Sequence, residues 1–147
     1  MTIEPLTTAD RDEWLPLWRG YLEFYRHSLS DEQTALTFNR ILDPGFAMWG
    51  AIARDDAGRA VGFVHWLTHS STWSEAPYCY LEDLFVAPDA RTSGTGRALI
   101  EHVTNWASTQ GIPKVYWQTA VDNSTARGLY DKVATTGFVV YEIDLPA

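Results

Sequence analysis

The sequence contains a single cysteine, Cys79, so no disulfide can form within the chain. No apolar run is long enough to cross a membrane, and residues 1–5 have neither the basic region nor the apolar run of a signal peptide. Low-complexity and Ser/Pro-rich stretches are also missing, and 147 residues is a typical length for one globular domain. We therefore expect a single domain over residues 1–147, soluble and cytoplasmic.

Basic residues are scarce relative to acidic ones. The chain has 11 Lys and Arg residues against 19 Asp and Glu, which gives a formal net charge of -8. This charge repels phosphate backbones and anionic lipid, so neither nucleic acid nor a membrane is expected as a partner. It would attract a cationic amine, although an acidic surface also serves solubility alone. Hydrophobic residues make up 46% of the chain, so we expect a packed core and a function located in a folded pocket.

Hydrophobic periodicity and turn residues predict alternating strands and helices. Trp14, Trp18, Tyr21 and Tyr25 form one stripe of a helix over about residues 8–29, with Thr8 as its N-cap. The stripe suits a core-facing surface, although Tyr21 and Tyr25 could also reach a cationic acceptor by cation–π contact. The other expected elements are a helix from Ser30 to before Asp43, strands over 46–53, 60–67 and 78–86, a helix from 98 to 111, a strand over 114–119, a helix over 123–132 and a strand over 138–145. This order, βααβββαβαβ, indicates an α/β or α+β chain with one βαβ crossover.

The segment from Arg91 to Arg97 has the sequence Arg-Thr-Ser-Gly-Thr-Gly-Arg, between a predicted strand and a predicted helix. Its two glycines leave backbone N–H groups uncovered at a helix N-terminus, where anions bind favourably. Arg91 and Arg97 add mobile positive charge, so the segment fits a pyrophosphate. No Walker A ending is present, and Leu99 stands where a Rossmann fingerprint needs its third glycine. A Gly-rich turn that binds no ligand is the alternative.

The spacing Arg91-x-x-Gly94-x-Gly96, after Leu84-Phe85-Val86, resembles motif A of the GCN5-related N-acetyltransferase (GNAT) superfamily. The run from Tyr80 to Val86 is further similar to the branch that holds yeast histone and D-amino-acid acetyltransferases. It is more distantly similar to diamine acetyltransferases.

Asn123 and Tyr130, seven residues apart, resemble the second signature of the superfamily. One departure is visible, because Gly137-Phe138 follows the tyrosine at a greater distance than is common. The resemblance implies a GNAT-like fold with a central mixed, mostly antiparallel sheet and flanking helices, and a single N-acetyltransferase domain that uses acetyl-coenzyme A. It also implies a cofactor site formed by Leu84, Phe85, Val86, Arg91, Thr92, Ser93, Gly94, Thr95, Gly96, Arg97, Asn123 and Tyr130.

The implied reaction needs a base. A primary amine has a pKa near 10.4, so about one molecule in a few thousand is nucleophilic at neutral pH. Glu82 and Asp83 are the candidate bases, and Tyr130 is a candidate to protonate the leaving thiolate. Strand alternation places Glu82 on the face of Tyr80 and Asp83 on the face of Leu81, so only one acid is expected to face the acceptor. Resemblance to diamine acetyltransferases favours Glu82 as the base and a structural role for Asp83. A solvated strand edge and an ordinary core tyrosine are the alternatives.

Other residues indicate less chemistry. His65 and His69 would lie about 13 Å apart on a strand, too far to share an ion, so no metal is expected. Cys79 as an acyl carrier would need a nearby base that the sequence does not suggest, so we expect a small buried residue. The apolar run 138–141 lies near an expected sheet edge and predicts a homodimer, because proteins of the resembled family pair through their C-terminal strands.

These features predict an N-acetyltransferase that moves the acetyl group of acetyl-coenzyme A to a small-molecule amine, a polyamine or an amino acid, by direct transfer in a ternary complex. Two alternatives remain: acetylation of lysine in proteins such as histones, and a non-catalytic acyl-coenzyme A-binding regulatory domain. The two acids and the tyrosine favour the enzyme.

Overall fold

The computed structural model describes residues 1–91 and 93–146, so Thr92, predicted to bind the cofactor, lies outside the described residues. The chain divides into two compact units, Met1–Tyr116 and Trp117–Ala147. The expectation of a single domain stays a prediction. None of the described helices is long and apolar enough to span a bilayer.

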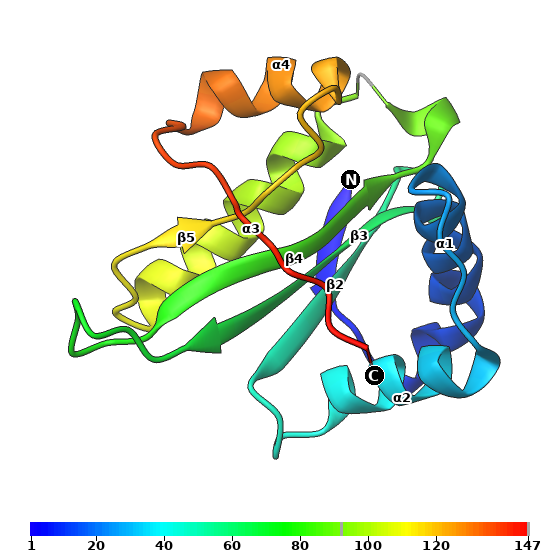
Figure 1. Ribbon diagram of the computed structural model, residues 1–147. Coiled ribbons are helices and arrows are strands. Elements are labelled where there is room, and N and C mark those ends of the chain that lie inside the picture. Colours follow the sequence, from blue (N-terminus) through cyan, green and yellow to red (C-terminus); the bar gives the residue numbers. More distant parts are fainter. Residues whose placement is uncertain (92, 147) are drawn as a thin grey trace. The chain divides into compact units, whose positions relative to one another are not determined.

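The first unit is built on a five-stranded sheet in the order β1-β2-β3-β4-β5 (Figure 1). Neighbouring strands from β1 to β4 are antiparallel, whereas β4 and β5 are parallel, so the predicted mixed, mostly antiparallel sheet is confirmed. The strand predicted over 78–86 is confirmed at both ends. The strand predicted over 114–119 contributes only two residues to the sheet. The strands are β1 (Thr2–Pro5), β2 (Met48–Arg54), β3 (Ala60–His69), β4 (Tyr78–Val86) and β5 (Val115–Tyr116).

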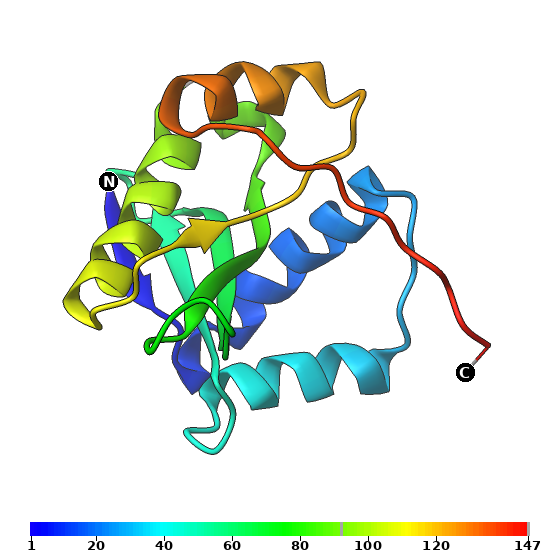
Figure 2. The same ribbon diagram turned by 60° about the vertical axis from the view of Figure 1, so that its left-hand side comes forward.

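Helices cover both faces of this sheet. On one face, α1 (Arg11–Phe24) packs on β3 and β4, and α2 (Asp31–Leu42) packs on β2. On the other face lies α3 (Thr95–Thr109), whose Trp106 ring meets the rings of Trp49 and Trp66 at 4.7 and 5.5 Å. The two views in Figures 1 and 2 show the sheet between α1 and α3. Short 3-10 turns, η1 (Thr8–Asp10) and η2 (Pro88–Ala90), precede α1 and α3.

The first helix is shorter than predicted. Its start is set by Asp10, which accepts hydrogen bonds from the Thr7 backbone at 2.7 Å and from Arg54 of β2 at 2.7 Å. It ends at Phe24 because Arg26 takes a left-handed conformation, with φ of 51°, that a helix cannot continue. The second helix confirms the prediction, since the Ser30 hydroxyl accepts from the Gln33 backbone at 3.1 Å.

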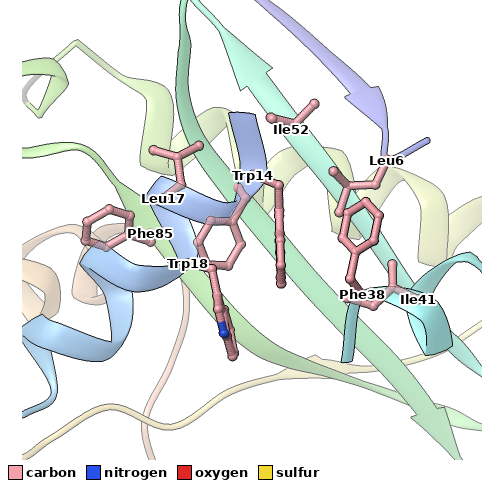
Figure 3. Packing of buried hydrophobic residues seen from close by; sticks show 9 residues of the cluster. Leu6, Trp14, Leu17, Trp18, Phe38, Ile41, Ile52 and Phe85 are labelled. Atoms are coloured by element: carbon pink, nitrogen blue, oxygen red, sulfur yellow. The ribbon is translucent and has the colours of Figure 1, made fainter. Parts of the chain in front are cut away.

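The aromatic stripe of α1 forms much of the core. Trp14 is fully buried and stacks on Trp18, with ring centroids 5.5 Å apart. Phe38 of α2 meets Trp14 at 4.9 Å, and Phe63 of β3 meets Trp18 at 6.0 Å. Figure 3 shows how the labelled side chains of this cluster gather between the helices and the sheet. This half of the stripe is core, as predicted, and it fixes α1 on the sheet.

The second unit contains α4 (Ser124–Val133), close to the predicted helix. The strand predicted over 138–145 was wrong, because residues 134–146 contain no regular element in the part of the chain that the structure describes. β-branched and aromatic residues favour a strand there, but a strand forms only where a neighbouring backbone completes its hydrogen-bond ladder.

Close packing at Gly50 generates a test of the fold. A methyl group there would lie 2.6 Å from Leu6 Cδ1 and 3.2 Å from His65 Cδ2. We expect Gly50→Ala to lower the free energy of unfolding in urea by about 1–3 kcal/mol through overpacking. The control is Gly128→Ala in α4, where an added Cβ meets no described atom within 4 Å and a better helix former replaces glycine. Equal stability of Gly50→Ala and the parent chain would contradict this account of the packing.

Candidate active site

A β-bulge lies in the middle of β4. His65 pairs with Asp83 and its neighbour Trp66 pairs with Leu81, so Glu82 is an extra residue in the ladder. A bulge adds one residue to one strand and thereby switches the face of every residue beyond it. Leu81 keeps to the α3 face with its partner Trp66, whereas Asp83 lies on the α1 face with its partner His65. The prediction that Asp83 shares a face with Leu81 was therefore wrong, because it assumed unbroken alternation.

Both acids line the same cleft on the α1 face. The cleft has a volume of about 330 Å³, and aromatic and apolar residues form much of its lining. The prediction that only one acid faces the acceptor amine rested on the same unbroken alternation. The lining residues are Trp18, Tyr21, Leu22, Tyr25, His27, Leu29, Thr37, Met48, Glu82 and Asp83.

The two carboxylates have different surroundings. Asp83 is half-buried, and its Oδ2 lies 2.9 Å from His65 Nδ1. Burial raises the pKa of the Tyr21 phenol, and the negative charge of Asp83 raises it further. Glu82 is exposed as a residue, yet burial around its carboxyl raises its pKa, and the adjacent charge of Asp83 adds to the shift. Both effects favour the protonated form of Glu82.

A second group of aromatic residues lies near Glu82. Tyr80 and Tyr116 meet at a ring distance of 4.9 Å, and the Tyr116 hydroxyl bonds His69 Nε2 at 2.7 Å. Burial raises the pKa of Tyr80 to about 12, with a further contribution from Glu82.

The outer edge of β4 is open beyond the bulge. Among the described strands, β5 pairs with β4 only at Cys79 and Tyr80. The backbone N–H of Ala87 donates to Val61, so alternation along the antiparallel ladder turns the main-chain groups of Leu84 and Val86 away from β3. These are the groups predicted to bind the cofactor, and they face the open edge.

Phe85 differs from its two neighbours. Its side chain belongs to the core cluster, and its ring meets Tyr21 at 6.3 Å. The same alternation turns its main-chain groups toward β3. The structure therefore gives Phe85 a packing role between two residues that face the open edge.

The predicted glycine turn lies at the N-terminus of α3. Gly94 is the N-cap with φ of 83°, a conformation that glycine adopts without strain, and no acidic residue lies in the first turn. Ser93 and Thr95 bond each other at 2.8 Å between their hydroxyls, and Thr95 is buried. Gly96 and the exposed Arg97 follow within the first turn. The described backbone of this segment therefore lies at the positive end of a helix dipole.

Arg91 is not the mobile charge that the sequence predicted. Its Nε donates to the Val86 carbonyl at 3.1 Å, and its guanidinium lies over the rings of Phe24 and Phe85 at 5.6 and 5.7 Å. The aromatic faces attract the guanidinium cation, which explains why the side chain is held.

Asn123 and Tyr130 belong to the second unit. The Asn123 side chain caps α4 by accepting from the Ala126 backbone at 3.4 Å, and it donates to Thr119 at 3.2 Å. The ring of Tyr130 contacts that of Trp117 at 5.4 Å. The structure thus provides a local structural reason for Asn123.

The remaining reactive residues are engaged elsewhere. Cys79 is fully buried, and burial raises the pKa of its thiol to about 11, which confirms the prediction of a small buried residue. In the described part of the chain, no three His, Cys, Asp or Glu side chains gather as a metal site would require. Sequence reasoning considered His65 only as a metal ligand and missed its contact with Asp83. The available signal was a histidine inside an otherwise apolar strand run.

An open strand edge that leads to a helix N-terminus, with two acids on the same strand, suits a transferase that binds a phosphorylated cosubstrate beside an acceptor. Residues 13–134 match the Acetyltransferase (GNAT) family, and the chain belongs to this family. The predicted superfamily and the predicted class of enzyme, an N-acetyltransferase, are confirmed.

Similar proteins cover nearly the whole chain. D-amino-acid N-acetyltransferase HPA3 of Saccharomyces cerevisiae is 38% identical over 144 residues, which are 97% of this chain and 89% of that protein. The crystal structure of a probable acetyltransferase has a TM-score of 0.88 at 24% identity, covering 100% of this chain and 99% of its own. The structure of AAC(6')-Iy with the bisubstrate analogue CoA-S-monomethyl-acetylneamine has a TM-score of 0.83 at 20% identity, covering 99% and 98%. The two structures support the fold.

Proposed function

We propose that the protein transfers the acetyl group of acetyl-coenzyme A directly to a primary amine, in a ternary complex, with Glu82 as the general base. The observation that carries this proposal is the bulge in β4, which brings two carboxylates into one aromatic cleft beside an open strand edge. The acceptor we propose is a small-molecule amine, a polyamine or an amino acid. The similarity to a D-amino-acid N-acetyltransferase supports this range.

The cosubstrate would follow β4 toward α3. Its pyrophosphate fits the N-terminus of α3, where the backbone of Ser93 to Arg97 offers N–H groups at a positive helix end. Its pantetheine arm fits the main-chain groups of Leu84 and the N–H of Val86 at the open edge, where Arg91 already donates to the Val86 carbonyl. A solved structure of the same fold holds a bisubstrate analogue of coenzyme A, which supports coenzyme A as the cosubstrate. Thr92 and Asn123 remain proposed members of the site.

The chemistry follows from the charges of the cleft. The acceptor arrives as an ammonium ion at neutral pH, because a primary amine has a pKa near 10.4. Glu82 takes a proton from it, directly or through water, and the neutral amine then attacks the thioester carbonyl. The raised pKa of Glu82 makes it a better proton acceptor than an exposed carboxylate. As the tetrahedral intermediate collapses, the attacking nitrogen loses its second proton to solvent, and Tyr130 is proposed to give a proton to the departing thiolate and to regain one from solvent. The acidic composition suits a cationic acceptor and a cytoplasmic protein.

Covering the N-terminus of α3 should block the cosubstrate. We expect Gly96→Val to weaken acetyl-coenzyme A binding by about tenfold or more, because a branched side chain would cover backbone N–H groups of the first turn of α3. Titration calorimetry measures the dissociation constant, and circular dichroism checks the fold. Ser108→Val is the matched control, since it adds the same side chain at the other end of α3. Unchanged affinity in a folded Gly96→Val would disprove the pyrophosphate assignment.

Removal of the basic carboxylate should slow the reaction. Glu82→Gln keeps the shape of the side chain, and we expect kcat/KM at neutral pH to fall by roughly 10²–10⁴-fold. The defect should shrink as pH approaches the pKa of the amine, because more acceptor is then already deprotonated. Release of coenzyme A thiol reports the rate, and Glu101→Gln, an exposed acid on α3, is the control. A larger pH-dependent loss in Asp83→Asn than in Glu82→Gln would reverse the assignment.

We also propose a homodimer that pairs through the C-terminal segment. The apolar residues Val139, Val140 and Tyr141 favour a strand, yet residues 134–146 form no ladder within the described chain. A second copy would supply the missing backbone partner. We expect light scattering at micromolar concentration to report twice the chain mass of 16.6 kDa, and Val140→Lys to shift the mass toward one chain. A single-chain mass for the parent protein would rule the dimer out.

A further inference from the structure

A buried histidine connects α1 to the acids of the cleft. His65 is 2% exposed, and both of its ring nitrogens are bonded. Its Nε2 lies 3.0 Å from Trp14 Nε1, and its Nδ1 lies 2.9 Å from Asp83 Oδ2. An indole N–H only donates, so Nε2 accepts and carries no proton. The ring is therefore neutral, with its proton on Nδ1, and this N–H donates to Asp83.

The surroundings of His65 leave little room for another arrangement. Its ring lies 4.6 Å from the ring of Phe63 and 5.5 Å from that of Trp18. On β2 it is paired with Gly50, where a Cβ would come within 3.2 Å of His65 Cδ2. The neighbouring aromatic rings hold the imidazole in one orientation. Glycine at position 50 leaves the room that this orientation needs.

Few titratable groups face this buried bond. β4 contributes Asp83 and Glu82, α1 contributes Tyr21, and Tyr25 and His27, which follow α1, line the same cleft as Asp83. The core residues that α2 and β2 present to this region do not titrate: they are Phe38, Ile41, Ile52 and Thr34, whose hydroxyl accepts from Trp18 Nε1 at 3.3 Å. Asp83 is thus the only one of these groups that contacts the imidazole.

The bond from Trp14 decides the charge of the pair. A proton on His65 Nε2 would point at the indole N–H of Trp14. Protonation would therefore break a buried hydrogen bond and place two donor hydrogens against each other. His65 therefore stays neutral and leaves the charge of Asp83 uncancelled. A carboxylate offers about four acceptor positions, so Asp83 retains capacity for a further donor from the cleft that it lines.

We propose that Trp14 and His65 are positioning residues that hold Asp83 as an anion in the cleft, where it binds the ammonium group of the acceptor amine. The inference rests on the proposed transfer to an amine. Asp83 then selects the cationic form of the acceptor, and Glu82 beside it takes the proton. Neither Trp14 nor His65 needs to touch the acceptor, because both act through Asp83.

The protonation state of His65 can be read by NMR of its imidazole nitrogens between pH 5.5 and 8.5, with the signal assigned by its loss in His65→Gln. We expect the parent chain to show one neutral form, protonated at Nδ1, throughout this range. Trp14→Phe removes the indole donor, so His65 should then titrate, with its imidazolium stabilised by Asp83. Trp66→Phe, at the next residue but on the α3 face, should leave the His65 signal unchanged. A parent His65 that titrates, or that is protonated at Nε2, would overturn the proposal.

Binding to the cleft is measured by NMR titration with benzylamine and with benzyl alcohol, which has a similar shape and no charge. We expect the parent chain to bind benzylamine about tenfold more tightly, and Asp83→Asn to lose this preference. Trp14→Phe should lose the preference for benzylamine at pH 5.5, where a protonated His65 cancels the charge of Asp83. The same variant should regain the preference at pH 8.5. His65→Gln should keep it at both, because glutamine offers one donor and one acceptor and does not titrate. No preference in the parent chain would overturn the role of Asp83.

Turnover separates this inference from the proposed function. If the neutral His65 and the preference for benzylamine are both observed, yet no amine in a panel releases thiol from acetyl-coenzyme A, the proposed reaction fails while the cation site stands. If amines are acetylated and Trp14→Phe changes neither the titration of His65 nor the pH dependence of binding, the positioning role fails while the reaction stands.

Discussion

Glu82 is an extra residue in the ladder between β3 and β4, and the arrangement of the cleft follows from it. Without the bulge, Asp83 would point to the α3 face, into the packing around Trp66 and Trp106. With the bulge, Leu81 before it lies on the α3 face and Asp83 after it lies on the α1 face. A bulge also bends the strand that carries it. The open edge from Leu84 onward begins just beyond this point, where the ladder to β5 has ended.

Glu82 and Asp83 are adjacent carboxylates with the same chemistry, and their different surroundings give them different roles. Asp83 receives a hydrogen bond from His65 Nδ1 and has acceptor positions left for the cleft that it lines. Glu82 has the charge of Asp83 beside it and a partly buried carboxyl, and both favour its protonated form. A buried imidazolium would need compensation for its lost hydration, whereas the neutral ring bonded to Trp14 needs none. The division of labour between the acids thus originates in the aromatic core of α1.

The sequence predicted those elements whose signals are local. The strand over 78–86, the cap at Ser30 and the glycine turn before α3 each depend on neighbouring residues, and all three form. The bulge could not be predicted, because it is a property of pairing between two strands and leaves no mark in the alternation of one. The strand over 138–145 was predicted from composition, but strand formation depends on a partner backbone that composition does not report. His65 was overlooked because its partners lie 51 and 18 residues away.

The burial of Cys79 has a practical consequence for reagents that react with thiols. The thiol is the only one in the chain, and with a pKa of about 11 almost none of it is thiolate at neutral pH. Oxidants and disulfide reagents act on exposed thiolates, so the folded chain offers them no ready target. When acetyl-coenzyme A gives up its acyl group, the product is itself a free thiol in open solution. A colour reagent for thiols therefore reports the product against a nearly silent protein background, and the protein tolerates the reagent while it works.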